Sequence, residues 1–165
     1  MKSIFIQRLS GHKNDIDPVR FSTPPSVNQA IDEAMQHCIE AYAHQSQAQI
    51  SARIKTLQRE WDVERVLETN ASILSLTGLA LGAKVDRKWL ILPGVVLSFL
   101  LQHAIQGWCP PLPLIRALGV RTRREIDTET SVLKFLRGDF DTACQLESPQ
   151  ERAQAALKAL RGDMA

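Results

Sequence analysis

The 165-residue sequence has little of what marks strands, disulfide frameworks or metal sites. Aromatic residues make up 5% of it, and its apolar residues are mostly Ala, Leu, Ile and Val, a usage typical of helices rather than of β-sandwiches or barrels. The three cysteines, Cys38, Cys109 and Cys144, are far apart and form no C-x-x-C pair, which argues against a zinc finger and a disulfide scaffold. We therefore expect an all-α protein in a reducing compartment, with no metal and no cofactor.

Catalytic motifs are also missing. The sequence has no Gly-rich phosphate loop, no G-x-S-x-G, no H-E-x-x-H and no pair of carboxylates in an apolar setting. Its formal net charge of +2 gives no general attraction for nucleic acid. The N-terminus lacks the long apolar run and cleavage site of a secretory signal. The sequence thus predicts a protein that is not an enzyme, does not bind nucleic acid and is not secreted.

Two long uncharged segments occupy the middle of the chain. Residues 71–83 and 89–109 contain no Asp, Glu, Lys or Arg, and the short polar connection KVDRK joins them. At 1.5 Å per residue the second segment reaches about 30 Å, the thickness of a bilayer's hydrocarbon core. The pattern predicts a helical hairpin within residues 70–120, which either crosses a membrane or forms the core of a soluble bundle.

The spacing of small residues favours the membrane. Gly78 and Gly82 in the first segment, and Gly94 and Ser98 in the second, have the small-xxx-small spacing that lets membrane helices approach closely. A symmetric turn about Asp86 places Gly78 opposite Gly94. We expect these faces to pack the hairpin and to bring copies of the chain together as a homo-oligomer.

The residues around the hairpin indicate its orientation. Trp89 and Trp108 bracket the second segment, as indole rings do at the two interfaces of a bilayer. Three cations lie in the connection, whereas eight lie on the side of the termini: Arg53, Lys55, Arg59, Arg65, Arg116, Arg121, Arg123 and Arg124. By the positive-inside rule both termini are cytoplasmic. We expect the last four of these arginines to contact anionic lipid headgroups.

Helices are also predicted on both sides of the hairpin. Residues 1–25 show no sustained period, and we expect a loose tail. The segment 26–69 opens with an S-x-x-Q capping box and continues with apolar residues at three- or four-residue steps. It predicts surface helices or, alternatively, a coiled-coil partner site. We expect this amphipathic segment to lie on or near the inner leaflet.

The C-terminal segment, residues 121–165, predicts two more helices. One begins at a capping box at Thr122 and ends at Gly138, and the other begins with Ser148 and Pro149 and ends at Gly162. We expect these helices, too, to be amphipathic and cytoplasmic.

A polar stripe ends the second apolar segment. Gln102, Gln106 and Cys109 follow one another at helical spacing, with His103 alongside. The symmetric turn brings Gln102 near Asn70, so Asn70, Gln102 and Gln106 are predicted to form interhelical hydrogen bonds. Alternatively, Cys109 and His103 form a redox or sulfur-carrying thiol site. One Cys and one His are too few for a metal site, and the negative end of a helix dipole disfavours a thiolate.

The stretches LSLTGLALG and GWCPPLPLIRALGV, with Glu64-Arg65 before them, resemble the small bacterial inner-membrane domain of unknown function found at the C-terminus of the YgaP-type rhodanese. The resemblance covers residues 64–120. It implies a two-helix inner-membrane hairpin, often dimeric and sometimes encoded with sulfurtransferases, which makes a sulfurtransferase an expected partner. Cys109 matches the family's corner cysteine. The chain departs from the family in having no rhodanese domain and in carrying ETNAS where the first helix commonly starts with glycine.

These observations predict a small accessory or scaffold protein of the bacterial inner membrane. It would contact the lipid bilayer and self-associate through its glycine faces. The alternatives are a sulfur or redox relay using Cys109, and a soluble helical interaction module.

Overall fold

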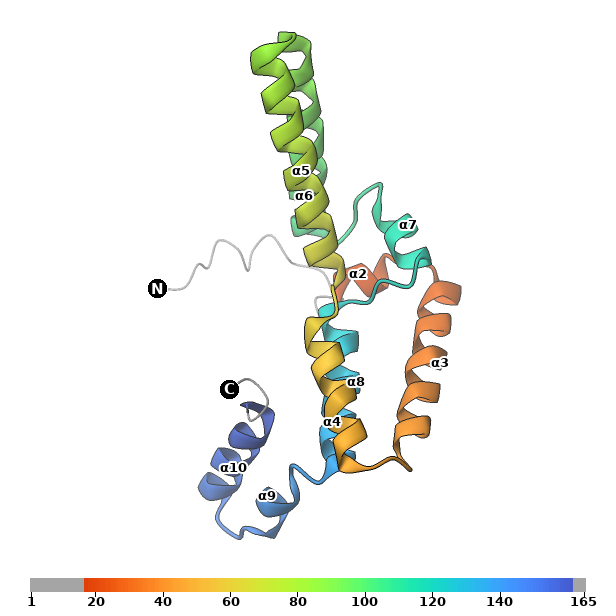
Figure 1. Cartoon of the computed structure of the whole chain (residues 1–165), viewed down its shortest axis with the longest axis vertical. Coiled ribbons are helices and arrows are strands. Elements are labelled where there is room, and N and C mark those ends of the chain that lie inside the picture. The colour runs from red at the N-terminus through yellow and green to blue at the C-terminus, as the bar shows by residue number, and fades with distance from the viewer. Residues whose placement is uncertain (1–16, 162–165) are drawn as a thin grey trace. The chain divides into compact units, whose positions relative to one another are not determined.

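The computed structural model describes residues 17–161, and this part of the chain is all-α, with no strand (Figure 1). The prediction of an all-α chain is confirmed. The chain divides into two compact units. Unit 1 comprises Trp61–Thr122 and the chain up to Gln29, and unit 2 comprises Ala30–Glu60 and the chain from Arg123 onward.

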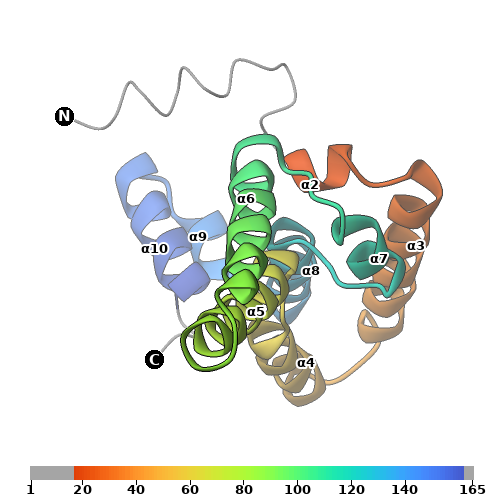
Figure 2. The ribbon, with the colours of Figure 1, turned by 90° about the horizontal axis from the view of Figure 1, so that it is seen from above.

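The two apolar helices of unit 1 form an antiparallel hairpin. Helix α5 spans Val63–Lys84, the 3-10 helix η1 spans Arg87–Leu90, and α6 spans Ile91–Gln106. Figure 2 shows α5 and α6 side by side, close to end-on. The Asp62 side chain begins α5 by accepting a hydrogen bond from the Arg65 amide at 2.9 Å. Gly107 ends α6 with φ 69°, in the left-handed region that favours glycine.

Only the first pair of small residues packs the hairpin. A Cβ on Gly78 would lie 2.5 Å from Pro93 Cδ, and a Cβ on Gly82 would lie 2.5 Å from Leu90 Cδ2. Gly94, by contrast, has nothing within 4 Å of that position. Ser98 is exposed, and its hydroxyl donates to the Gly94 carbonyl at 2.8 Å. The predicted pairing of Gly78 with Gly94 is therefore wrong, because one residue of register rotates the facing position by about 100°.

Two short helices lie at the open end of the hairpin. Helix α2 spans Pro18–Phe21, and α7 spans Leu112–Ala117. Together with the end of α5 and the turn after α6 they bury one apolar cluster, formed by Val19, Val63, Leu67, Cys109 and Leu112. We call this region, residues 107–122 with α2, the corner. Helix α2 falls inside the predicted loose tail, 1–25, of which residues 1–16 lie outside the described residues.

The chain enters and leaves the hairpin at one place. The Val63 amide, at the first residue of α5, donates to the carbonyl of Arg121 at 3.0 Å. The Thr122 hydroxyl donates to Asp17 Oδ2 at 2.9 Å, and Asp17 also begins α2 by accepting from the Arg20 amide. These bonds connect the start of α5, the segment after α7 and the start of α2 within unit 1.

Unit 2 is built from helices that precede and follow the hairpin. They are α3 (Pro25–Tyr42, mostly in this unit), α4 (Gln47–Arg59), α8 (Arg123–Arg137), α9 (Asp141–Gln145) and α10 (Pro149–Arg161). The core joins α4 to α8 through Ile50, Ile54, Leu57, Ile126 and Leu133. A capping box between Ser46 and Gln49 begins α4. Helices α8 and α10 occupy the two positions predicted after the hairpin, while α9 was not predicted.

Buried charged groups also hold unit 2 together. Glu129 is fully buried, and its Oε1 accepts from Arg53 Nε at 3.0 Å, from Arg53 Nη2 at 2.8 Å and from the Cys38 thiol at 3.2 Å. The buried Lys134 ammonium donates to the carbonyls of Ala159 and Leu160, which lie at the C-terminal end of α10. These bonds tie α3, α4 and α10 to α8.

Candidate functional site

The hairpin presents apolar side chains to its surroundings. Two stretches, Gln47–Lys84 and Arg87–Gln106, are long and apolar enough to cross a membrane, and only 28% and 11% of their most apolar windows are buried. The core helix of a soluble protein would be mostly buried. The large exposed side chains on α5 and α6 are Ile73, Leu74, Leu76, Leu79, Ile91, Val95, Leu97, Phe99, Leu101 and Ile105. An apolar surface of this extent marks an interaction with a partner or a membrane.

The same apolar surface continues over the corner, where two leucines near α7 are exposed and the arginine between them is buried. Leu114 and Leu118 are 66% and 75% exposed, whereas Arg116 between them is 0% exposed. Arg116 is also the one Asp, Glu, Lys or Arg residue between Lys88 and Arg121. Between Lys88 and Arg121, the outer surface therefore carries no charged group.

The Arg116 guanidinium is bound inside unit 1. Its Nε donates to Thr23 Oγ1 at 3.1 Å, its Nη2 to Asn28 Oδ1 at 3.0 Å and its Nη1 to the Val120 carbonyl at 2.9 Å. A buried guanidinium is tolerated when hydrogen-bond acceptors replace the water it has lost. Arg116 thus joins α7 to the N-terminal part of unit 1.

This placement changes the predicted lipid contacts. Arg116 and Arg121, expected to reach headgroups, are both buried, so the prediction is wrong for them. For Arg116 the physical reason is that its guanidinium donates three hydrogen bonds within unit 1. Arg123 and Arg124, at the start of α8, are exposed. For these two residues, contact with lipid headgroups stays a prediction.

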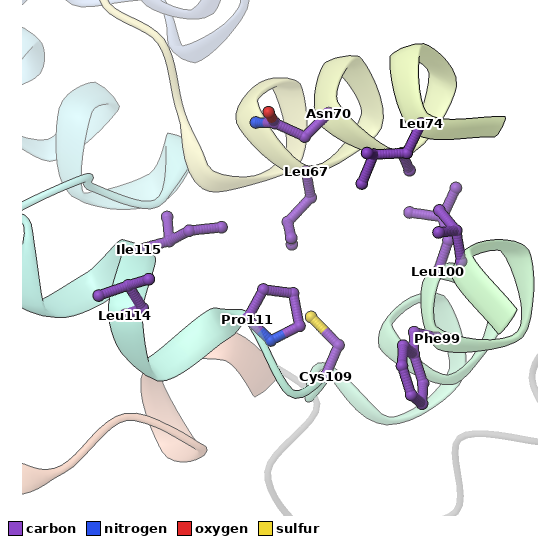
Figure 3. Close-up of a pocket in the computed structure, with 11 residues that line it drawn as sticks. Leu67, Asn70, Leu74, Phe99, Leu100, Cys109, Pro111, Leu114 and Ile115 are labelled. Atoms are coloured by element: carbon purple, nitrogen blue, oxygen red, sulfur yellow. The ribbon is translucent and has the colours of Figure 1, made fainter. Parts of the chain in front are cut away.

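An apolar pocket lies between the hairpin and the corner (Figure 3). Its volume is about 340 Å³. Figure 3 shows Leu67 from α5 and Cys109 from the corner pointing into the same space. The other lining residues are Asn70, Ala71, Leu74, Val96, Phe99, Leu100, Pro111, Leu114 and Ile115. None of the lining side chains is charged.

Cys109 and His103, the candidate thiol site, do lie together. The Cys109 sulfur is 3.6 Å from His103 Nδ1, and both residues are buried. Burial raises the pKa of the Cys109 thiol above its ordinary value. The thiol is then protonated at neutral pH, which makes it a poor nucleophile. In the described part of the chain, no three His, Cys, Asp or Glu residues are grouped to hold a metal ion.

The predicted interhelical polar residues are arranged differently from the expectation. The Asn70 amide donates to the Val66 carbonyl of its own helix at 2.7 Å, as exposed polar side chains of apolar helices commonly do. Gln102 is half-buried, and Gln106 is exposed at the last residue of α6. A different polar group is buried in the hairpin: Ser75 Oγ, which has no hydrogen-bond partner in the described structure.

Sequence reasoning missed the inward position of Arg116 and the buried Glu129. The first had a signal, since a single cation within a run of apolar residues and prolines is out of place on a lipid-facing surface. Glu129 had none, because the helix α8 carries other carboxylates at exposed positions such as Asp127.

Comparison with known proteins gives no relative for this arrangement. No protein-family model, curated protein or solved structure matches the chain.

Proposed function

We propose that this protein is a small accessory or scaffold protein of the bacterial inner membrane. The hairpin anchors it, and unit 2 presents helices on the cytoplasmic side. The observation that carries the proposal is the apolar outer surface of unit 1, which runs over residues 71–83 of α5, over α6 and over α7 while Arg116 turns inward. Water disfavours such a surface and hydrocarbon does not.

The composition of unit 2 supports a common side for both termini. Helix α4 precedes the hairpin and α8 follows it, and their side chains share one core. A chain that crossed the bilayer once would leave these two helices on opposite sides. An even number of crossings is therefore required, and the excess of cations beside the hairpin ends supports a cytoplasmic location for them.

Membrane fractionation with a charge variant tests the anchor. We expect the full-length chain to stay in the membrane pellet in high salt and alkaline carbonate and to be released by detergent. Leu97→Arg places a cation near the middle of α6, where insertion costs about 2.5–3.5 kcal/mol, and should move part of the chain into the soluble fraction.

Leu157→Arg is the matched control, because Leu97 and Leu157 are both 51% exposed and only Leu97 lies on the hairpin. It should leave the distribution unchanged. Release of the unmodified chain by carbonate alone would contradict the anchor and favour a soluble interaction module.

We expect copies of the chain to associate through the exposed small residues of α6 rather than through the glycines of α5, which are buried inside the hairpin. Gly94 and Ser98 are exposed, whereas the Gly78 face is filled by Pro93. Gly94→Leu should weaken the homo-oligomer in detergent about tenfold, which is ~1.4 kcal/mol, since bulk there prevents close approach of helices. Sedimentation velocity at graded detergent concentrations measures it.

The neighbouring Val95, 45% exposed, supplies the control for this experiment. Val95→Leu should leave the oligomer intact, and both variants should keep the helix content of the unmodified chain. If Gly94→Leu leaves the stability of the homo-oligomer unchanged, self-association does not use the Gly94 surface.

A further inference from the structure

We propose that the apolar pocket of unit 1 binds one acyl chain of a bilayer phospholipid. The inference rests on the proposed membrane function, because the ligand enters from the bilayer. The pocket lies where the apolar helices meet the corner, so a lipid chain alongside the hairpin passes its mouth (Figure 3).

The lining fixes the chemical class of the ligand. A volume of about 340 Å³ is within the range of small-molecule sites. The polar side-chain groups in the lining are the Asn70 amide, which donates to the Val66 carbonyl, and the Cys109 thiol, which lies beside His103. With no charged side chain in the wall, the pocket can take hydrocarbon but not a phosphate or a carboxylate.

The mouth of the pocket is open to a chain from the side. Leu74, Phe99 and Leu114 line the pocket and are also 45%, 40% and 66% exposed. The apolar wall therefore continues without a break onto the outer faces of α5, α6 and α7. An acyl chain can move from that surface into the pocket without passing a charged group, whereas a polar metabolite would have to be desolvated first.

The inward position of Arg116 on α7 keeps this wall free of charge. With Arg116 held by Thr23, Asn28 and Val120, the helix directs Leu114 and Ile115 to the pocket and Leu118 to the outside. A helix that faced water would present its arginine instead. Burial of Arg116 thus removes a charge from the outer surface and also leaves the neighbouring pocket lined by apolar side chains.

Photocrosslinking in vesicles tests the site. The full-length chain is reconstituted with phosphatidylethanolamine and a phospholipid that carries a diazirine at the end of one acyl chain, and adducts are mapped by mass spectrometry. We expect adducts at Leu67 and Ile115 inside the pocket, besides those at Leu76 and Leu97 on the outer surface. Leu74→Trp fills the mouth and should lower the pocket adducts about tenfold, equal to ~1.4 kcal/mol of binding.

Leu76→Trp is the control, since Leu76 is exposed on the same helix but does not line the pocket; it should leave the pocket adducts unchanged. Adducts on the outer surface without adducts in the pocket would overturn the acyl-chain site, and so would pocket adducts that Leu74→Trp does not reduce. Either result would still be consistent with the membrane anchor. Absence of adducts along the whole hairpin would instead refute the anchor. Pocket labelling by a diazirine fatty acid but not by the phospholipid would refute the phospholipid as its source.

The Cys109 thiol gives a second measurement that needs no change in the pocket. In a Cys38→Ser, Cys144→Ser chain in detergent at alkaline pH, where part of the thiol is ionised, an alkyl methanethiosulfonate should modify Cys109 through the pocket. Added phospholipid should slow the reaction about tenfold. A rate that phospholipid does not change would count against occupancy of the pocket.

Discussion

Arg53→Met is expected to lower the free energy of unfolding of unit 2 by about 3–5 kcal/mol, because it leaves a buried carboxylate without the two guanidinium hydrogen bonds it now accepts. The side chain of Glu129 is 0% exposed, and that of Arg53 is 25% exposed. The carboxylate therefore cannot turn to water without opening the contact between α4 and α8. Hydrogen exchange of the amides of Ile126 and Leu133, in the core of α8, measures the loss.

Two further variants separate charge burial from packing. Lys55→Met changes an exposed cation on the same helix and should leave exchange unaltered. Arg53→Met combined with Glu129→Leu removes both charges, so it should recover much of the stability. If the double variant is as unstable as Arg53→Met, the loss comes from packing of the Arg53 stem rather than from the lost hydrogen bonds to the Glu129 carboxylate.

Arg116→Met is expected to destabilise the corner by about 3 kcal/mol, since it leaves the acceptors of Thr23, Asn28 and Val120 without this donor in a buried place. The side chain keeps similar length and apolar bulk, so the loss reports hydrogen bonding more than volume. We expect faster hydrogen exchange at Val19–Phe21 in α2 and at Ile115–Ala117 in α7, while α6 is unaffected.

Arg124→Met, at an exposed position, is the control and should change neither segment. If Arg116→Met behaves like Arg124→Met, the guanidinium does not hold the corner. A variant that also unfolded α5 and α6 would show that the corner and the hairpin form one cooperative unit rather than two.

Local chemistry made the helix ends predictable. Capping residues act within three or four positions of the chain, so Thr122 and Ser148 marked α8 and α10 correctly, and Gly138 follows α8 with φ 85°. The same reasoning passed over Ser46 and Asp62, which begin α4 and α5. Ser46 lies between two glutamines and Asp62 between Trp61 and Val63, and the apolar period singles out neither position as a helix start.

The register of the hairpin and the burial of its polar residues could not be predicted from the sequence, because they depend on contacts between residues far apart in the chain. The hairpin could be predicted from two uncharged segments, but whether Gly78 meets Gly94 or Pro93 depends on how η1 completes the turn. Arg116 was assigned to lipid headgroups from its basic neighbours, while its actual partners, Thr23 and Asn28, lie far away in the sequence. The proximity of Cys109 and His103 was predictable, because both lie at one helix end.

The shared core of α4 and α8 has a consequence for how the protein is made. Helix α4 leaves the ribosome before the hairpin and corner are synthesised, and it has to wait for α8 with Ile50, Ile54 and Leu57 uncovered. Unit 2 can then assemble only after the intervening residues 60–122 have been made. Under the proposed membrane topology, a chain with only one of the two hairpin helices inserted would keep this apolar face uncovered and prone to misassembly, so the discontinuous core couples folding of unit 2 to insertion of the complete hairpin.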